Sequence, residues 1–524
     1  MGRRTITTAN AETATPRQDE AGGQGAPAAT PWWQRPWASW VLVVLVALGV
    51  YFIDYGQPRH LFWDENYHST SAERYLHGVA QFEPHPPLAL MLIAAGEKVV
   101  GINSDIDKTK LTLVKYIGGN DVPEGFTPMG MRLMPTLFAV LAAVAFFALT
   151  LELVGNRAAA LLLTSIYMFE NAFIVHFRAV HLDSFQMFFA IVFFWLFVKA
   201  WRSEQPLRWK EYAVMGAVAA LAIMVKVNGV MLLALFVPLY FHDARHIGWR
   251  AWGTLARDFA LKSGSAVVAL LLVVFAVFYV HALIGNTLPN PAGEAGRQDM
   301  ENMSQIYRSQ LETQSAVTPI VVGAITRDYF KFMDKDHLGV PKLDVCKPGE
   351  NGSYPLSWVI ENKNINYRWD SSNGKTRYVQ LAGNHLSWLF GLVAVVMAFG
   401  LMLARRVFGM PVANARIYSL IEVFGSLYIV FMGLHIYLGA QRVMYLYHYF
   451  LGLLISYILV VLLWMYLEEV KPFIKRHRLT LLGIAAALVF VSYAYVSPLT
   501  YHWPLSKQQC ERENWFHKTV ECQG

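Results

Sequence analysis

An all-α polytopic membrane protein is the fold class that this sequence predicts, on three observations. The 524 residues are 55% hydrophobic and 14% aromatic, and only 15% of them are charged. The mean hydropathy of +0.33 is high for a soluble chain of this length. The apolar residues gather in long runs, and the net charge of +7 is spread over short basic clusters between those runs. This distribution of charge is typical of membrane topology and does not indicate the single basic patch of a nucleic-acid-binding protein.

Residues 1–39 precede the first apolar run. They are rich in Ala, Thr, Gly, Gln and Pro and have no apolar periodicity. Such a composition predicts a disordered tail, which we place in the cytoplasm. The segment lacks a short apolar core followed by a small-residue cleavage site. We therefore expect no removed signal peptide, and the run that begins at Trp40 stays as a membrane anchor.

The apolar runs predict a transmembrane domain over residues 40–497. A helix needs roughly 17 to 25 apolar residues to cross a hydrocarbon core of about 30 Å. About eleven runs approach or meet this length, at residues 40–53, 133–154, 158–174, 185–198, 212–225, 230–241, 267–284, 386–404, 417–438, 449–467 and 479–496. The fifth and sixth runs could form one tilted helix or two. We favour two, because the distribution of charge is then consistent.

The basic residues between the runs predict which side of the membrane each connection faces. With the N-terminus inside, every inner connection is basic, as the positive-inside bias requires. The inner clusters include Arg157, Arg208, Arg250, Arg405 and Lys475. The outer side then receives residues 54–131, 178–183, 285–385, 439–448 and the C-terminal tail 498–524. Most polar residues that could do chemistry collect in these outer segments or at the ends of the spans beside them.

Two further features belong to the predicted outer side. The apolar stretch 86–100 is too short to span and ends near Glu97 and Lys98, so we expect a helix that lies in the membrane interface. All of the cysteines, Cys346, Cys510 and Cys522, also fall on this side. If that side is oxidising, Cys510 and Cys522 are the natural disulfide pair, with free thiols as the alternative.

Asp64 and Glu65 form an acidic pair in the first outer segment. Acidic pairs in loops are usually solvated surface charge. Here Trp63 and Tyr67 flank the pair, as suits a lipid–water boundary, and a charge close to lipid is costly to keep there without a use. The pair is therefore a candidate catalytic group.

Two more polar clusters lie at the outer ends of predicted spans. The stretch FENAFIVHFRAVHLDS carries Glu170, Arg178 and Asp183. The guanidinium of Arg178 could bind a phosphate by paired hydrogen bonds. A structural ion pair between Arg178 and Asp183 is the alternative. The stretch GAQRVMYLYHYFLG carries Arg442, a candidate for contact with lipid phosphate, among aromatic residues that could simply form an interfacial belt.

The usual signatures of soluble chemistry are absent from the sequence. There is no Gly-rich phosphate loop, no His/Cys spacing for a metal and no nucleophile elbow. His85, which stands beside two prolines, has no i, i+4 partner of the zinc type. We expect neither a metal nor a cofactor, and no nucleic acid as a partner.

The chain carries, in this order, the motifs WDENYH, HPPLAL, ENAFIVHFRAVHLDS, VKVNG, YPLSW, LAGN and YLYHYF. In order and spacing they resemble the protein O-mannosyltransferase family of polyprenyl-phosphate-dependent membrane glycosyltransferases. The resemblance implies a GT-C fold in the plasma (inner) membrane, with the active site on its outer, periplasmic face. It also implies an inverting transfer of mannose from a polyprenyl (dolichyl-type) monophosphate to Ser or Thr hydroxyls of exported proteins.

The resemblance also implies roles for individual residues. Asp64 and Glu65 match the family's acidic pair, and Asp64 is expected to take the proton from the acceptor hydroxyl as its oxygen attacks the anomeric carbon. Arg178 and Arg442 are expected to stabilise the phosphate leaving group, with Lys226 as the next candidate. The supporting residues expected from these motifs are His85, Asp183, Glu170, Tyr447, His448 and Asn384.

The sequence departs from the family pattern in two places. Ala89 and Leu90 stand where the family usually has Gly and Lys, and the segment 285–385 lacks the large soluble insert of eukaryotic members. The second departure indicates a prokaryotic-type member and leaves a lipid or glycan acceptor open, as in an aminoarabinose transferase. A transporter or flippase for a lipid-linked sugar is a further hypothesis. Transporters usually hold their polar groups near the midplane and often show internal repeats, whereas these groups lie at the ends of spans.

Overall fold

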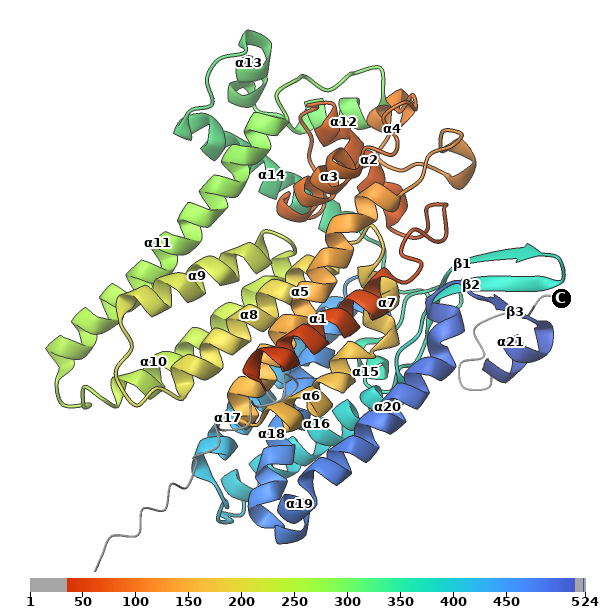
Figure 1. Ribbon diagram of the computed structural model, residues 1–524. Helices are drawn as coiled ribbons and strands as arrows, with labels where there is room; N and C mark the ends of the chain where they lie inside the picture. The colour runs from red at the N-terminus through yellow and green to blue at the C-terminus, as the bar shows by residue number, and fades with distance from the viewer. Residues whose placement is uncertain (1–34, 514–521, 523–524) are drawn as a thin grey trace, which may run out of the picture.

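The computed structural model of the chain describes residues 35–513 and Cys522. Long helices run side by side through most of the molecule, and shorter helices cover one end of them (Figure 1). Of the predicted tail 1–39, residues 1–34 lie outside the described part. Its last residues belong to a helix, α1 (Pro36–Phe52). Proline at the start of α1 favours this earlier beginning, because its fixed φ suits the first helical turn and no N–H is needed there.

Eight helical spans in the described part of the chain are long and apolar enough to cross a membrane. They are α5 (Met129–Val154), α8 (Asp183–Trp201), η3 (Val227–Leu235) with α10 (Phe236–Ala244), α11 (Trp252–Ile284), α16 (His385–Arg406), α17 (Ala415–Gly439), η4 (Leu446–Tyr449) with α18 (Phe450–Val470), and α20 (Arg478–Thr500). A ninth is counted if α6 (Arg157–Met168) and α7 (Asn171–Phe177), which meet at 63°, form one broken span. The predicted class, a polytopic helical membrane protein, is confirmed.

Each predicted apolar run lies in helical structure, but the third run is divided between α6 and α7, and the helices of two other runs are shorter than a span. The first run forms α1, which has 17 residues, and the fifth forms α9 (Trp209–Ile223), which has 15. By length and hydropathy, the expected number of about eleven spans falls to eight or nine among the described residues. The fifth and sixth runs do form two helices, since α9 ends before Lys226 and η3 begins after it.

A cap of short helices lies over one end of the bundle (Figure 1). It is formed by α2 (Glu65–Leu76), α3 (Leu88–Val100), α4 (Thr109–Leu113), η2 (Gly119–Asp121), α12 (Glu294–Asn302), α13 (Gln305–Thr313) and α14 (Pro319–Gly339). The predicted interfacial helix corresponds to α3. It approaches α5 closely, because a Cβ at Gly96 would lie 2.9 Å from the carbonyl oxygen of Gly130. Its position relative to a membrane stays a prediction.

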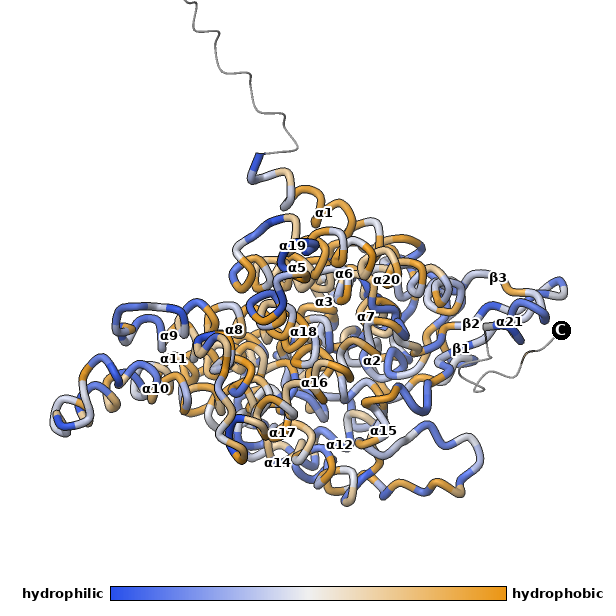
Figure 2. The backbone as a smooth tube through the Cα atoms, turned by 90° about the horizontal axis from the view of Figure 1, so that it is seen from below, coloured by the Kyte–Doolittle hydropathy of each residue, from blue (hydrophilic) through white to orange (hydrophobic). Residues whose placement is uncertain are grey.

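The interior of the bundle is built around α18. The most apolar stretch of α18 is 78% buried, whereas that of α11 is 22% buried. The exposed face of α11 carries Val267, Leu271, Leu272 and Phe275, which are side chains that lipid can cover. Figure 2 shows the hydrophobic colour concentrated in the long helices and the hydrophilic colour in the segments that connect them.

A small antiparallel sheet, which the sequence analysis did not anticipate, joins the segment 285–385 to the C-terminal tail. Its strands follow the order β1 (Ile365–Ser372), β2 (Lys375–Leu381) and β3 (Pro504–Leu505). Beyond β3, α21 (Lys507–Glu513) carries Cys510, which forms the predicted disulfide with Cys522. Cys346 is exposed and free. Two further short helices, α15 (Pro355–Trp358) and α19 (Pro472–Arg476), lie in connections between longer ones.

Candidate active site

A cavity of about 600 Å³ lies between the cap and the bundle. It is lined by six of the predicted site residues, namely His85, Asp183, Lys226, Arg442, Tyr447 and His448. Apolar side chains such as Met187, Leu438 and Leu451 line other parts of its wall. A larger cavity of about 910 Å³ at the other end of α8 contains none of the predicted residues. A cavity with charged and apolar walls suits a lipid that carries a charged head group.

Asp183 is the first residue of α8 and joins two basic side chains at this cavity. Lys226 Nζ lies 2.7 and 2.8 Å from the two carboxylate oxygens of Asp183. His176 Nε2 lies 2.9 Å from Asp183 Oδ2. The expected alternative, an ion pair between Arg178 and Asp183, is therefore wrong. The chain turns after α7 so that Asp183 meets Lys226 and His176 instead.

Asp64 immediately precedes α2 and is connected to the cavity through Tyr447. The Tyr447 hydroxyl donates to Asp64 Oδ2 at 3.3 Å, and the Tyr447 ring stacks on His176 with centroids 5.0 Å apart. Lys226 Nζ lies 5.4 Å from the centre of the same Tyr447 ring. Asp64 is half-buried, and no described side chain donates to its other carboxylate oxygen. One oxygen of Asp64 is thus available to a substrate.

Glu65 has a different environment from its neighbour Asp64. Its side chain is fully buried, and Arg132 of α5 donates to both carboxylate oxygens at 2.7 Å. The backbone N–H of Val180 donates to Oε1 at 2.8 Å and that of Phe62 to Oε2 at 3.2 Å. With both oxygens occupied, Glu65 cannot take a proton from a substrate without losing these bonds. Glu65 thus holds the cap to α5, and of the two carboxylates only that of Asp64 has an open oxygen, while the catalytic role of the pair stays a prediction.

Arg178 does not line the cavity, so its predicted role at the donor phosphate stays a prediction without support from this geometry. Its guanidinium donates to the carbonyl oxygen of Ile53 and lies 4.7 Å from the ring centre of Tyr501. Burial lowers the pKa of Arg178 to about 10. A small void of about 10 Å³ beside Arg178 and Arg132 has no room for a phosphate. Arg178 therefore connects the end of α1 to the end of α20.

Arg442 and His85 do line the cavity. Arg442 Nε is buried without a hydrogen-bond partner, and no described side chain forms an ion pair with the guanidinium. Burial lowers the pKa of Arg442. Burial and, next, the charge of Lys226 hold the pKa of His85 well below its usual range. The neutral imidazole of His85 and the guanidinium of Arg442, which has no ion-pair partner among the described side chains, therefore line the same cavity.

The expected supporting residues divide into two groups. His448 and Tyr447, on the η4 turn, line the cavity. Glu170 and Asn384 do not, because they cap α7 and α16 and are fully buried. Glu170 accepts a hydrogen bond from the Asn384 backbone at 2.9 Å and from the Tyr457 hydroxyl at 2.6 Å. Glu170 and Asn384 thus contact neighbouring helices and not the cavity, and their supporting role stays a prediction.

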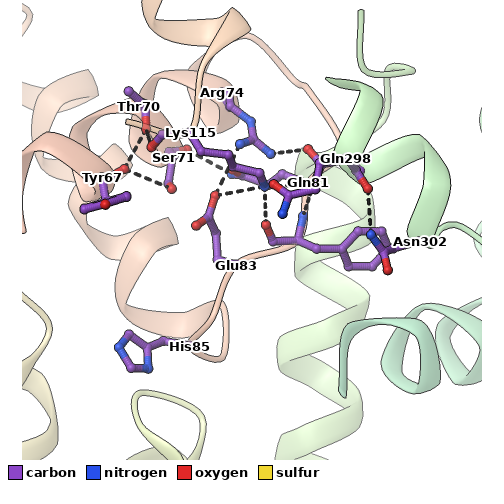
Figure 3. A network of polar contacts seen from close by, with 12 residues as sticks. Tyr67, Thr70, Ser71, Arg74, Gln81, Glu83, His85, Lys115, Gln298 and Asn302 are labelled. Atoms are coloured by element: carbon purple, nitrogen blue, oxygen red, sulfur yellow. Dashed lines mark hydrogen bonds and ion pairs between the residues drawn. The ribbon is translucent and has the colours of Figure 1, made fainter. Parts of the chain in front are cut away.

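A buried ionic network lies in the cap (Figure 3). Arg74 donates to Glu83 Oε1 at 3.2 Å and also to Asp299 of α12. Lys115 donates to Asp299 Oδ1 at 2.8 Å. Figure 3 shows Arg74, Glu83 and Lys115 turned toward one another, with His85 farther along the loop that carries Glu83. The network therefore fixes the loop that delivers His85 to the cavity.

Sequence reasoning missed several residues that build the site. Arg132 and His176 were not assigned roles, although Arg132 stands directly before an apolar run, where a charge needs a partner. Tyr367 of β1, whose hydroxyl lies 2.7 Å from His176 Nδ1, gave no signal in the sequence because it is far away along the chain. Within the described ranges, no group of three or more His, Cys, Asp or Glu side chains is arranged to hold a metal.

Two family models match the chain. The model described as dolichyl-phosphate-mannose-protein mannosyltransferase matches residues 41–286. The model described as the C-terminal four TMM region of protein-O-mannosyltransferase matches residues 342–519. The two matches lie on either side of the segment that carries α12, α13 and α14.

Named relatives are similar over part of their length. Protein O-mannosyl-transferase 2 of Drosophila melanogaster is 26% identical over 288 residues, which are 52% of this chain and 36% of that protein. Dolichyl-phosphate-mannose--protein mannosyltransferase 3 of Saccharomyces cerevisiae is 25% identical over 265 residues, which are 47% of this chain and 33% of that protein. The matched region thus spans about a third of the length of these curated relatives.

One solved structure is similar over nearly the whole chain. It is the S. cerevisiae protein O-mannosyltransferase Pmt1-Pmt2 complex bound to the sugar donor, with a TM-score of 0.72 and 14% identity. The similarity covers 91% of this chain and 92% of that chain. At this identity the likeness shows the fold, which is the GT-C fold that the sequence motifs implied.

Proposed function

Because the chain belongs to the dolichyl-phosphate-mannose-protein mannosyltransferase family, we propose that it transfers mannose from a polyprenyl monophosphate to Ser or Thr hydroxyls of a polypeptide. One observation carries the proposal. The available carboxylate of Asp64 contacts Tyr447, which lines a cavity that also receives Lys226 and Arg442. Two cations therefore line one cavity, and a base lies one side chain away from it, beside Tyr447, as an inverting transfer from a lipid phosphate requires.

The proposed reaction is a single displacement at the anomeric carbon. The acceptor oxygen forms a bond to that carbon while the bond from the carbon to the phosphate oxygen breaks. The proton of the acceptor hydroxyl moves to Asp64, and the electron pair of the broken bond leaves with the polyprenyl phosphate. Because the attack comes from the face opposite the leaving group, the anomeric configuration inverts.

Arg442 is the first candidate for binding the phosphate, and Lys226 is the second. The charge of Lys226 is already shared with Asp183 at 2.7 Å, whereas the Arg442 guanidinium has no ion-pair partner among the described side chains. Charge-assisted hydrogen bonds from a guanidinium to phosphate can be paired, which fixes the phosphate in orientation as well as position. Arg178, which lies outside the cavity, is not part of this proposal.

The same proposal places the cap on the outer side of the membrane. The positive-inside bias supports this orientation, because Arg202, Arg406 and Lys471 lie at the ends of α8, α16 and α18 that are remote from the cap. Cys346 is exposed and should react with a membrane-impermeant maleimide in intact cells, whereas Cys346→Ser should not. In that background, Arg250→Cys should react only after permeabilisation. Labelling of Arg250→Cys in intact cells would reverse the orientation.

The activity is tested with purified protein, a defined polyprenyl-phosphate mannose, and a Ser/Thr-containing peptide. We expect a mannosylated peptide whose anomeric configuration is opposite to that of the donor, and almost none with Asp64→Asn. A lipid acceptor is assayed in parallel. Transfer to the lipid alone would replace the polypeptide acceptor in the proposal. Donor binding without transfer to either acceptor would instead support a transporter or flippase for the lipid-linked sugar.

A further inference from the structure

The β1–β2 hairpin projects from the side of the molecule beside the cap (Figure 1). β2 is the middle strand and pairs with β1 on one side and β3 on the other. In the part of the chain that the structure describes, no further strand pairs with the outer edge of β1. A free edge presents a row of backbone N–H and C=O groups that are ready to pair with another extended chain.

The outer half of β1 lacks two of the residue types that usually keep a free edge from pairing, and its charged residues, Arg368 and Asp370, pair with each other. Such edges commonly carry proline or lysine. The strand INYRWDSS contains neither, and Trp369 within it is 53% exposed. Ser371 and Ser372 are exposed as well. The outer edge of β1 is thus accessible along the half that points away from the bundle.

The inner end of β1 reaches the candidate active site. The register shifts between Asn366 and Arg368, so Tyr367 is an extra residue, as in a β-bulge, and bulges re-aim side chains near active sites. The Tyr367 hydroxyl lies 2.7 Å from His176 Nδ1. Its ring centre lies 5.2 Å from that of Trp63, which directly precedes Asp64. The inner end of β1 therefore lies close to Trp63, the residue before the carboxylate that we assign as the base.

A polypeptide is the ligand class that fits this edge, because only a peptide backbone repeats the donors and acceptors that a strand edge pairs with. We propose that the acceptor polypeptide binds to β1 as an added strand, which guides its Ser or Thr hydroxyl to Asp64. The inference rests on the proposed function and adds to it how the acceptor is recognised. With Arg368 paired to Asp370, Lys375 and Arg377 leave the hairpin positive, which favours acidic side chains in the acceptor.

The pairing is tested on the peptide. Alternate N–H groups of a strand point to the same edge, so N-methylation at one set of alternate residues blocks pairing and at the other set does not. Two peptides with one threonine and acidic flanks are N-methylated at two alternate residues each, in opposite phase. They serve as matched controls, because the same number of amide hydrogens is lost in both.

We expect one phase to raise KM about tenfold, with kcat kept, and the other to leave KM within about twofold of the parent peptide. Equal effects of the two phases would overturn strand addition while leaving the mannosyltransferase proposal intact. Failure to transfer mannose to the parent peptide itself would overturn the proposed polypeptide acceptor, and strand addition with it. The parent peptide thus separates the two failures.

A second test changes the protein. Trp369→Lys adds a lysine to the exposed edge and should raise KM for a peptide with one threonine and uncharged flanks, which the new charge does not attract, without changing donor affinity. Trp503→Lys is the matched control, because Trp503 is 39% exposed and lies before β3, away from the free edge of β1. If Trp369→Lys and Trp503→Lys gave the same KM, the edge of β1 would not be the binding surface.

Discussion

Lys226 and Lys262 make nearly the same contact near opposite ends of the span formed by η3 and α10. Lys226 Nζ lies 2.7 Å from Asp183 Oδ1, and Lys262 Nζ lies 2.6 Å from Asp243 Oδ2. Lys262 binds a second carboxylate, Asp258, at 2.7 Å, and its side chain is 2% exposed. The Lys226 side chain is 12% exposed and lines the cavity beside Tyr447.

We call Lys226, Asp183 and His176 the cavity cluster, and Lys262, Asp243 and Asp258 the distal cluster. Because both clusters contain a lysine–carboxylate ion pair, the ion pair by itself does not identify a functional site. In the distal cluster two carboxylates surround Lys262, and these ion pairs join α10 to α11. In the cavity cluster the same kind of pair leaves one side open to a ligand. The two clusters therefore differ in whether a ligand can still reach the charged groups, and this separates a functional ion pair from a structural one.

The largest expected effect is on Asp64, which adds a base to the cavity cluster. Asp64→Asn keeps the size and the contact with Tyr447 but removes the base, so turnover should fall at least about 100-fold with donor affinity nearly kept. The measurement is steady-state turnover beside donor binding. Glu65→Gln is the contrasting variant, because it should mainly lower thermal stability by weakening the contact with Arg132. Turnover of Asp64→Asn within a few-fold of wild type would remove Asp64 as the base.

The second prediction compares the two lysines directly. Lys262→Met should lower the free energy of unfolding by about 3–5 kcal/mol, because two carboxylates then lose their cation in a buried place. Its turnover per folded molecule should stay unchanged. Lys226→Met should lower turnover by about tenfold or more, because Lys226 lines the cavity and is the second candidate for binding the leaving phosphate. Thermal unfolding and turnover are measured on both variants in the same detergent.

A reversed pattern would break the comparison between the clusters. If Lys226→Met lost only stability and Lys262→Met lost turnover, access to the cavity would not be what separates the two lysines. The phosphate site would then have to lie closer to the end of the bundle that is remote from the cap, where the larger cavity is.

The third prediction compares the two arginines that the sequence proposed for the phosphate. Arg442→Lys keeps the charge but loses the planar fork, so donor affinity should fall about tenfold for a paired contact. Arg178→Lys should leave donor affinity unchanged and lower thermal stability, because Arg178 packs on Tyr501 and donates to Ile53. Donor binding in detergent and melting temperatures decide between the two. Equal loss of affinity in both variants would contradict the placement of Arg178 outside the site.

How much of the fold the sequence predicts depends on how far apart along the chain the interacting residues are. Each apolar run formed a helix because the runs are local, and the Cys510–Cys522 pair was predictable because the two residues lie close together in the chain. The sheet was missed, because β3 joins β2 across more than a hundred residues. Only the fold brings such segments together.

The candidate site shows the same limit. Lys226 and Arg442 became candidates as charges close to apolar runs, and Asp64 as one of an acidic pair with aromatic neighbours. The partner of each charge was not predictable, and this decided the outcome for Glu65 and Arg178. Glu65 pairs with Arg132, and Arg178 packs under Tyr501 from the far end of the chain. Adjacent acidic residues therefore received different roles from contacts that the sequence does not show.

The smallest expected effect is a pH dependence that comes from the wall of the cavity. Burial and the charge of Lys226 hold the pKa of His85 well below 6.5, so the folded protein keeps this imidazole neutral. In the unfolded chain His85 takes up a proton near pH 6.5. The unfolded state therefore binds more protons below that pH, and this stabilisation is complete above about pH 6.5 and lost as the pH falls.

His85→Gln removes this proton uptake, and melting temperatures at pH 7.5 and 5.5 measure it. Wild type should lose up to about 1.4 kcal/mol per pH unit from His85, and the variant should lose less over the same interval. Part of the decline should remain in His85→Gln, because burial also lowers the pKa of His68 and His337, which lie near His85. The matched variant is His77→Gln, because His77 is 45% exposed and lies away from the cavity. An equal acid decline in wild type and His85→Gln would mean that His85 is charged in the folded protein, which would add a third cation to the proposed phosphate site.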